Sequence, residues 1–139
     1  MPGRDIFHEQ VKQALVKDDW IITDDPLTIP FGNTDVYIDL GAESLLAAEK
    51  DTRRIAVEIK SFLQPSVVNE FHTALGQFLN YRAALVPFDP HRQLYLAIPL
   101  DAYTTFFAQP FVQRILQHHQ VTAVIYDPST EEVVQWINW

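Results

Sequence analysis

The chain has 139 residues, of which 47% are hydrophobic and 12% aromatic, and its formal net charge is −8. This length suits one well-buried core, so we predict a single domain over residues 1–139. The absence of cysteine excludes disulfides and thiolate chemistry. No run approaches the roughly 18 apolar residues of a membrane span and the N-terminus lacks a signal-peptide pattern, which predicts a cytoplasmic protein with no membrane contact. The negative charge counts against broad binding to phosphates, so any nucleic-acid contact should be local or assisted.

The first third of the chain predicts one helix and two strands. Residues 5–18 carry apolar side chains at near-helical spacing, which predicts a helix with Asp5 as its N-cap. Residues 20–25 predict a short strand, and residues 26–33 predict a loop because proline and glycine interrupt regular structure. Residues 34–41 alternate between apolar and polar side chains, which predicts a second strand. The expected apolar stripe of the helix is Ile6, Val11, Leu15 and Val16, and the polar face of the second strand is Asp35, Tyr37 and Asp39.

The remaining elements predict a sheet enclosed by helices. Residues 42–53 form a connection with room for a helical turn, and residues 54–62 predict a third strand. A helix capped by Ser66 should follow, with Val67, Phe71, Leu75 and Phe78 as its core stripe. The later patterns predict strands at 93–100, 121–127 and 131–139, and a helical stretch at 101–120 that Pro110 kinks or divides. This element order predicts an α/β sandwich with a central mixed β-sheet flanked by helices.

Two of the predicted strands carry charge opposite their apolar stripes. Ile55, Val57 and Ile59 share one face of the third strand, while Glu58 and Lys60 share the other. If this strand pairs with the second strand, Asp39 and Glu58 converge, and a hard divalent cation such as Mg²⁺ would offset their repulsion. Lys60 would then stand beside the cation, where it can act on water or on a phosphate under attack. This pattern predicts metal-assisted hydrolysis of a phosphodiester.

The pattern of Asp39 followed by Glu58 and Lys60 on the next strand, between two helices, resembles the PD-(D/E)XK nuclease superfamily. The resemblance implies a restriction-endonuclease-like sandwich and a metal-dependent deoxyribonuclease that uses Mg²⁺ or Mn²⁺. Asp39, Glu58 and the backbone carbonyl of Ile59 would ligate the metal, and Glu9 matches a position from which some members add an acid. Four residues apart on the following helix, Gln77 and Tyr81 resemble the Gln-x-x-x-Tyr element of RecB-type members. Their implied roles are orienting the site and binding the substrate, and Glu70 and Thr73 should extend their polar stripe.

Several ungapped blocks make the whole chain resemble a cyanobacterial family, XisH, called the fdxN element excision controlling factor. They include "DIFHEQVKQAL", "YIDLGAE", "AVEIKSF" and "EFHTALGQFLNYR". The resemblance implies control of programmed DNA excision, with DNA, a site-specific recombinase and an XisI-like companion protein as partners, and it allows a homodimer.

Simpler interpretations compete with the nuclease hypothesis. Acid and lysine on one strand face commonly form a solvated ion pair worth ~0–1 kcal/mol. Glu9 can be an ordinary exposed helix residue, and His8, His72 and the pair at 118–119 lack a ligand partner at a convincing spacing. At the level of function, the rival is a non-catalytic accessory factor that keeps the nuclease fold to bind XisI, the recombinase or DNA. The intact acids and lysine favour the enzyme, whereas the charge of −8 favours the accessory role.

Overall fold

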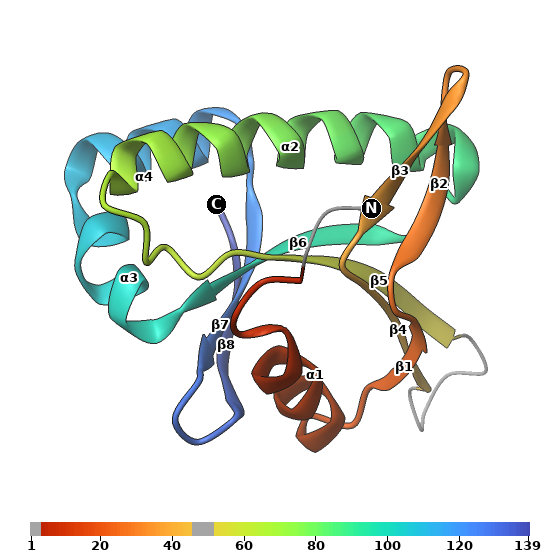
Figure 1. Ribbon diagram of the computed structural model, residues 1–139, viewed down its shortest axis with the longest axis horizontal. Coiled ribbons are helices and arrows are strands. Elements are labelled where there is room, and N and C mark those ends of the chain that lie inside the picture. The colour runs from red at the N-terminus through yellow and green to blue at the C-terminus, as the bar shows by residue number, and fades with distance from the viewer. Residues whose placement is uncertain (1–3, 46–51) are drawn as a thin grey trace.

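The centre of the protein is a six-stranded mixed sheet with helices on both faces, as predicted (Figure 1). This computed structural model describes residues 4–45 and 52–139. The strand order is β1-β4-β5-β6-β7-β8, and a separate two-stranded hairpin is formed by β2 and β3. The strands are β1 Ile21–Asp24, β2 Leu27–Phe31, β3 Thr34–Ile38, β4 Leu40–Leu45, β5 Thr52–Ile59, β6 Gln93–Pro99, β7 Thr122–Asp127 and β8 Glu132–Asn138. The helices are α1 His8–Lys17, α2 Val67–Phe88, α3 Leu100–Thr104, the short 3-10 helix η1 Phe106–Ala108, and α4 Pro110–His118.

The three middle strands, β5, β6 and β7, run parallel, whereas β1, β4 and β8 pair antiparallel with their neighbours. The long helix α2 connects β5 to β6, and the segment from α3 to α4 connects β6 to β7. The carboxyl ends of β5, β6 and β7 therefore lie at one edge of the sheet. In open α/β sheets ligands bind at this edge.

Two apolar clusters cover the opposite faces of the sheet. On the α1 side, Ile55 and Val57 of β5 pack with Val11 and Leu15, and all four are buried. On the α2 side, residues of β6 and β7 pack under α2, η1 and α4. The predicted charged face of β5 is charged only near the carboxyl end of the strand. Ala56, which lies on the same face as Glu58, is fully buried on the α2 side.

The prediction of a loop at residues 26–33 is wrong, since these residues form most of the β2–β3 hairpin. Leu27 and Ile29 are buried in the α2-side core, which holds the hairpin against the rest of the protein. Pro30 is tolerated because β2 pairs with a single strand, so its missing N–H costs little. Gly32, with φ of 62°, and Asn33 make the two-residue turn at the tip.

The predicted second strand is also two strands, which meet at Asp39. β3 ends at Ile38 in the hairpin, and β4 begins at Leu40 in the main sheet, pairing antiparallel with β5. Residues 42–45 therefore continue a strand, and the expected helical turn falls on residues 46–51, outside the described part of the chain.

The helix predictions hold in outline and fail at one end. α1 begins at His8, so Asp5 is not its N-cap; the Asp5 carboxylate instead accepts the Phe7 N–H at 2.9 Å. Ile6 and Val16 are exposed, unlike the rest of the predicted stripe. Ser66 caps α2 as predicted, and the helical stretch after β6 is divided, with Pro110 as the first residue of α4. No helix within residues 4–45 and 52–139 is long and apolar enough to span a membrane.

Candidate functional site

A small cavity of about 140 Å³ brings together most of the residues that the sequence singles out. The β3–β4 junction contributes Asp39, the end of β5 contributes Glu58, and α2 covers them. The cavity thus gathers side chains from distant parts of the chain at the carboxyl end of β5. Its lining residues are Asp5, Tyr37, Asp39, Glu58, Ile59, Lys60, Gln77 and Tyr81.

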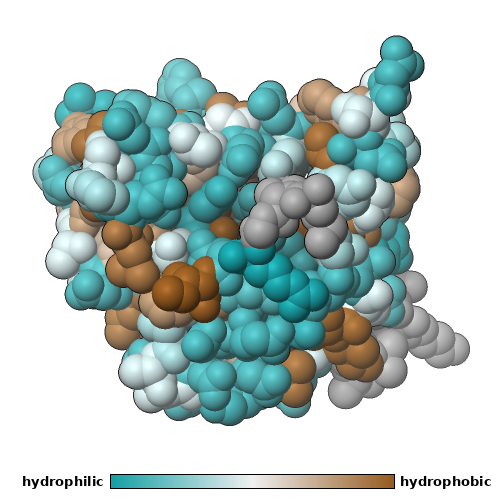
Figure 2. All heavy atoms as spheres, in the orientation of Figure 1, coloured by the Kyte–Doolittle hydropathy of each residue, from teal (hydrophilic) through white to brown (hydrophobic). Residues whose placement is uncertain are grey.

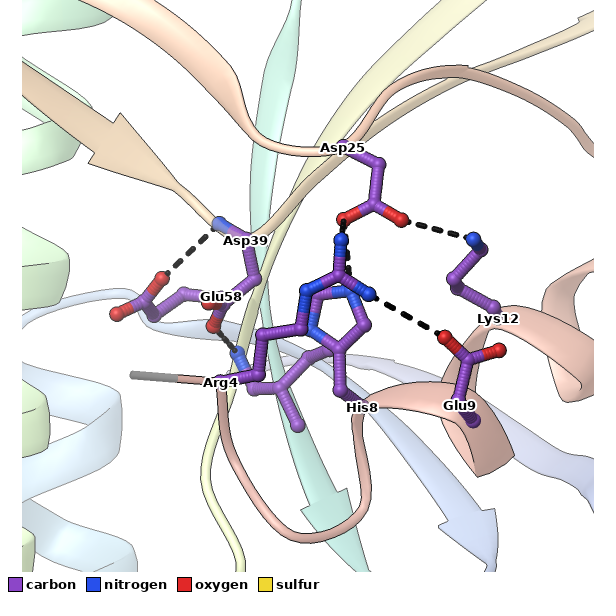
Figure 3. A network of polar contacts seen from close by, with 8 residues as sticks. Arg4, His8, Glu9, Lys12, Asp25, Asp39 and Glu58 are labelled. Atoms are coloured by element: carbon purple, nitrogen blue, oxygen red, sulfur yellow. Dashed lines mark hydrogen bonds and ion pairs between the residues drawn. The ribbon is translucent and has the colours of Figure 1, made fainter. Parts of the chain in front are cut away.

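Two hydrogen bonds between the β3–β4 junction and the end of β5 hold Asp39 and Glu58 beside each other (Figure 3). The Ile59 N–H donates to Oδ2 of Asp39 at 2.7 Å, and the Asp39 N–H donates to Oε1 of Glu58 at 3.3 Å. The break between β3 and β4 makes this possible, because Asp39 is released from strand pairing and its carboxyl turns toward β5. These bonds use one oxygen of each carboxyl.

Glu58 is buried, with 6% of its surface exposed. Burial, reinforced by the neighbouring Asp39 carboxyl, raises the pKa of Glu58 to about 9, and the Lys60 ammonium only partly offsets the rise. Lys60 Nζ lies 3.8 Å from Oε2 of Glu58. Without an additional positive charge, Glu58 therefore keeps its proton at neutral pH.

The face of α2 over the cavity carries Gln77 and Tyr81, one helical turn apart. Oε1 of Gln77 is buried and has no hydrogen-bond partner among the described residues. Burial raises the pKa of Tyr81, and the charges of Glu58 and Asp39 raise it further, so the phenol stays protonated as a donor. A buried acceptor without a partner lowers the stability of the fold. The Gln77 oxygen is therefore a candidate to accept a hydrogen bond from a ligand or a water.

These residues fit a hard divalent cation. Two carboxyls, the unpaired Gln77 oxygen and the backbone at Ile59 form an oxygen-rich wall, and oxygen is the ligand that Mg²⁺ and Mn²⁺ prefer. Within residues 4–45 and 52–139, no group of three or more acidic or imidazole side chains forms a complete cage. Mg²⁺ is usually bound by one or two carboxylates together with substrate oxygens, so Asp39 and Glu58 are the two side chains that could hold it.

The structure places Glu9 outside this cavity. Its side chain is exposed and lies 3.4 Å from Arg4 in a separate network centred on Asp25 (Figure 3). Asp25 accepts hydrogen bonds from His8 at 2.7 Å and Lys12 at 2.8 Å. Burial opposes ionisation of Asp25, but these bonds outweigh it and lower the pKa of the carboxyl. The network ties α1 to the segment between β1 and β2.

Two cavity residues, Asp5 and Tyr37, were not predicted as part of the site. The alternation of residues 34–41 did place Tyr37 on the same face as Asp39, which was a usable signal. Asp5 carried no such signal, because its position before a helix favours a capping role. Burial raises the pKa of Asp5, as does the nearby Asp39, whereas the hydrogen bond from the Phe7 N–H and the nearby polar groups of Ser61 partly offset the rise.

The segment that follows Lys60 is held by buried side chains. Both carboxylate oxygens of Glu70 accept backbone hydrogen bonds, from the Phe62 N–H at 2.6 Å and the Gln64 N–H at 3.1 Å. Phe62 has φ of 53°, which is strained for a residue other than glycine. Glu70 itself is buried, with 6% of its surface exposed, and it holds this segment instead of lining the cavity with Gln77 and Tyr81. The Tyr126 hydroxyl also donates to the Lys60 carbonyl at 3.2 Å.

Replacement of Glu70 by alanine should destabilise the protein by roughly 2–4 kcal/mol, because two backbone N–H groups lose their acceptor. Glu70→Gln keeps an acceptor oxygen and should lose less. Thermal unfolding of the three proteins measures this, with Tm falling by several degrees for Glu70→Ala. Equal Tm values for the parent and Glu70→Ala would show that the carboxylate does not hold the segment.

The fold and site define a mixed α/β protein whose parallel-strand edge carries two carboxyls, a lysine and a glutamine in one cavity. The chain belongs to the XisH family: the family model described as XisH protein matches residues 1–134. An XisH family protein from Nostoc punctiforme PCC 73102 is 49% identical, with a TM-score of 0.86, covering 96% of this chain and 100% of that one. An fdxN element excision controlling factor protein from Anabaena variabilis is 51% identical, with the same TM-score, covering 97% and 100%. No functionally curated protein matches the chain.

Proposed function

We propose that this protein is a metal-dependent deoxyribonuclease of the PD-(D/E)XK type that acts in programmed DNA excision. The observation that carries the proposal is the convergence of Asp39, Glu58, Lys60 and Gln77 in one cavity. A solvated ion pair without a function would not require a buried glutamate beside a second carboxyl and an unpaired buried amide oxygen. The order of strands and helices around the cavity supports the restriction-endonuclease-like fold.

In this proposal, Asp39, Glu58 and the Ile59 carbonyl hold Mg²⁺ or Mn²⁺. When bound, such a cation would supply Lewis-acid stabilisation of a phosphate and would make water a stronger nucleophile. Lys60 directs its ammonium at the charge that develops during attack. Gln77 orients the attacking water by accepting a hydrogen bond from it through its free carbonyl, and the Tyr81 hydroxyl donates to the substrate backbone. Glu58 would have to lose its proton in order to hold the cation, because a carboxylic acid ligates poorly.

The biological setting is proposed from the relative in Anabaena variabilis, which is described as an fdxN element excision controlling factor. We place the present protein in the same class of process, with DNA as substrate and with a site-specific recombinase and an XisI-like protein as partners. A companion would supply the positive surface that a chain of charge −8 lacks.

The net charge also favours a second candidate function, a non-catalytic accessory factor that uses this fold to bind the recombinase, XisI or DNA. Incubation with supercoiled, single-stranded and branched DNA, with and without the companion and with Mg²⁺ or EDTA, separates the two. Mg²⁺-dependent products support the nuclease. Binding to partners with no cleavage under any of these conditions supports the accessory factor.

Asp39→Asn should raise stability in metal-free buffer by on the order of 1 kcal/mol, because it removes a charged side chain placed for function, and such side chains commonly hold a fold below its stability optimum. The asparagine oxygen can still accept the Ile59 N–H. Millimolar Mg²⁺ should stabilise the parent through preferential binding to the folded state, and the variant much less. Thermal unfolding in EDTA and in Mg²⁺ measures both effects. A parent that is more stable than Asp39→Asn in EDTA and indifferent to Mg²⁺ would contradict the metal site.

A further inference from the structure

A second and larger cavity, of about 340 Å³, lies at the same edge of the sheet. Pro99 at the end of β6 and Pro128 just after β7 form part of its wall, together with residues 61–63 and the first turn of α2. It therefore occupies the crevice outside the carboxyl ends of the parallel strands, where α/β proteins bind ligands. Cavities of this size accommodate small organic groups.

The wall of this cavity is mostly apolar and aromatic, with a few polar groups. Phe7, Phe62 and Phe106 contribute rings, while Asp101 and Thr105 contribute a carboxylate and a hydroxyl. The Thr105 hydroxyl donates to the Asp101 carbonyl at 2.7 Å, which leaves its oxygen to accept from a ligand. A hydrophobic patch stands out on this face around α3 and the loop before α2, next to a polar surface (Figure 2).

The apolar cavity adjoins the acid and lysine cavity. Asp5 and Lys60 line the latter, whereas Phe7 and Ser61, which are their near neighbours in sequence, line the former. Ser61 lies beside the Asp5 carboxyl and lowers its pKa, so the two segments form a common wall between the cavities. A ligand with a phosphodiester at Lys60 would thus bring its attached groups to the mouth of the apolar cavity.

The common wall is rigid. Glu70 holds the strained backbone of Phe62, and the Phe62 ring packs edge-to-face on Phe107 with centroids 5.0 Å apart. Strain of this kind persists only where the surrounding structure fixes it, and it concentrates at ligand sites.

We propose that this apolar cavity binds one unstacked nucleobase of a single-stranded segment of the DNA substrate, next to the phosphodiester held at Lys60. The inference rests on the proposed function and names its substrate class. A nucleobase is flat, aromatic and uncharged, so stacking on the rings gives affinity without neutralising phosphates, which suits a chain of charge −8. The Asp101 carboxylate is placed to accept from an exocyclic amino group of the base, as acidic side chains accept from cytosine.

The first test titrates the ¹⁵N-labelled protein with 2′-deoxycytidine, using 2-deoxyribose 5-phosphate as the control that lacks a base. We expect amide shifts at Ser61, Leu63 and Ala102 with the nucleoside, and none there with the sugar phosphate. Ala102→Phe, which fills the cavity from α3, should remove them. Shifts confined to other regions overturn the inference even if the protein cuts DNA, and shifts here without any cleavage contradict only the proposed function.

The second test measures binding of single-stranded and fully paired oligonucleotides to the otherwise unaltered protein by fluorescence anisotropy, in EDTA so that no metal-dependent cleavage occurs. Adding Leu63→Ala or Ala102→Phe should weaken single-strand binding by roughly five-fold or more and leave duplex binding unchanged. Val86→Ala is the matched control for Leu63→Ala, because the two side chains are similarly exposed, at 61% for Val86 and 63% for Leu63. Val86 lines a different cavity, so its loss should leave both forms of binding unchanged. Equal losses on both DNA forms, no loss in either variant, or no single-strand binding at all would overturn the inference.

Discussion

Lys60→Ala is expected to lower the rate of DNA cleavage by about 10²–10³-fold or more while leaving cation binding intact. Lysine is not itself a ligand, and its ammonium lies 3.8 Å from Glu58, where it competes with a cation for the carboxylate. Removing it should therefore leave Mn²⁺ affinity equal or higher. Glu58→Gln should lose both DNA cleavage and cation binding, since it replaces the ionisable ligand with a neutral side chain of the same shape.

Plasmid cleavage and calorimetric titration with Mn²⁺ measure the two effects separately. Lys17→Ala is the matched control, because Lys17 is an exposed lysine on α1 that donates to the Thr130 carbonyl, far from the cavity in sequence. It should behave as the parent in both assays. Equal loss of Mn²⁺ affinity in Lys60→Ala and Glu58→Gln would contradict the roles assigned to them.

The second large effect is a fall in the stability of the metal-free protein with rising pH. Folding raises the pKa of Glu58 from 4.5 to about 9, so between these values the folded state holds a proton that the unfolded state has released. The free energy of unfolding therefore decreases as pH rises, by up to about 1.4 kcal/mol per pH unit. Glu58→Gln cannot titrate, so its stability should vary less over the same range.

Urea unfolding in EDTA at several values between pH 5 and pH 8 provides the comparison. The difference between the parent and Glu58→Gln isolates Glu58, because Asp5 and the other shifted carboxyls are present in both. Glu9→Gln, on the exposed side of α1, should follow the parent. Parallel curves for the parent and Glu58→Gln would show that Glu58 is not protonated in the folded protein.

Periodicity predicted the elements whose burial is regular. The strands at β6, β7 and β8, the cap of α2 and the division at Pro110 agree with the structure because each depends on local pattern or backbone chemistry. The β2–β3 hairpin was missed because Pro30 and Gly32 are loop signals that a two-stranded edge tolerates. Its burial against the α2-side core is a tertiary effect that no local window contains.

The candidate site was predicted in part for a similar reason. Alternation placed Glu58 and Lys60 on one face of the β5 segment, and helical spacing placed Gln77 and Tyr81 on one face of α2. The four side chains share a cavity because α2 covers the end of β5. The position of Asp39 at a junction between two sheets could not be read from an unbroken alternating pattern. The role of Glu70 depends on a loop backbone that lies eight residues earlier in the chain, and helical spacing carries no information about it.

The contacts around Lys60 determine when, during synthesis, this cavity comes into existence. Its N–H donates to the Ala97 carbonyl at 3.3 Å, and its carbonyl accepts from the Tyr126 hydroxyl. A ribosome that has released only the first sixty residues has therefore delivered both acids and the lysine, but not the strands that fix their positions. The cavity acquires its geometry only after residues 97–126 have emerged and folded, so a nascent or prematurely terminated chain carries the chemical groups of the site without the arrangement that the proposed cation would need.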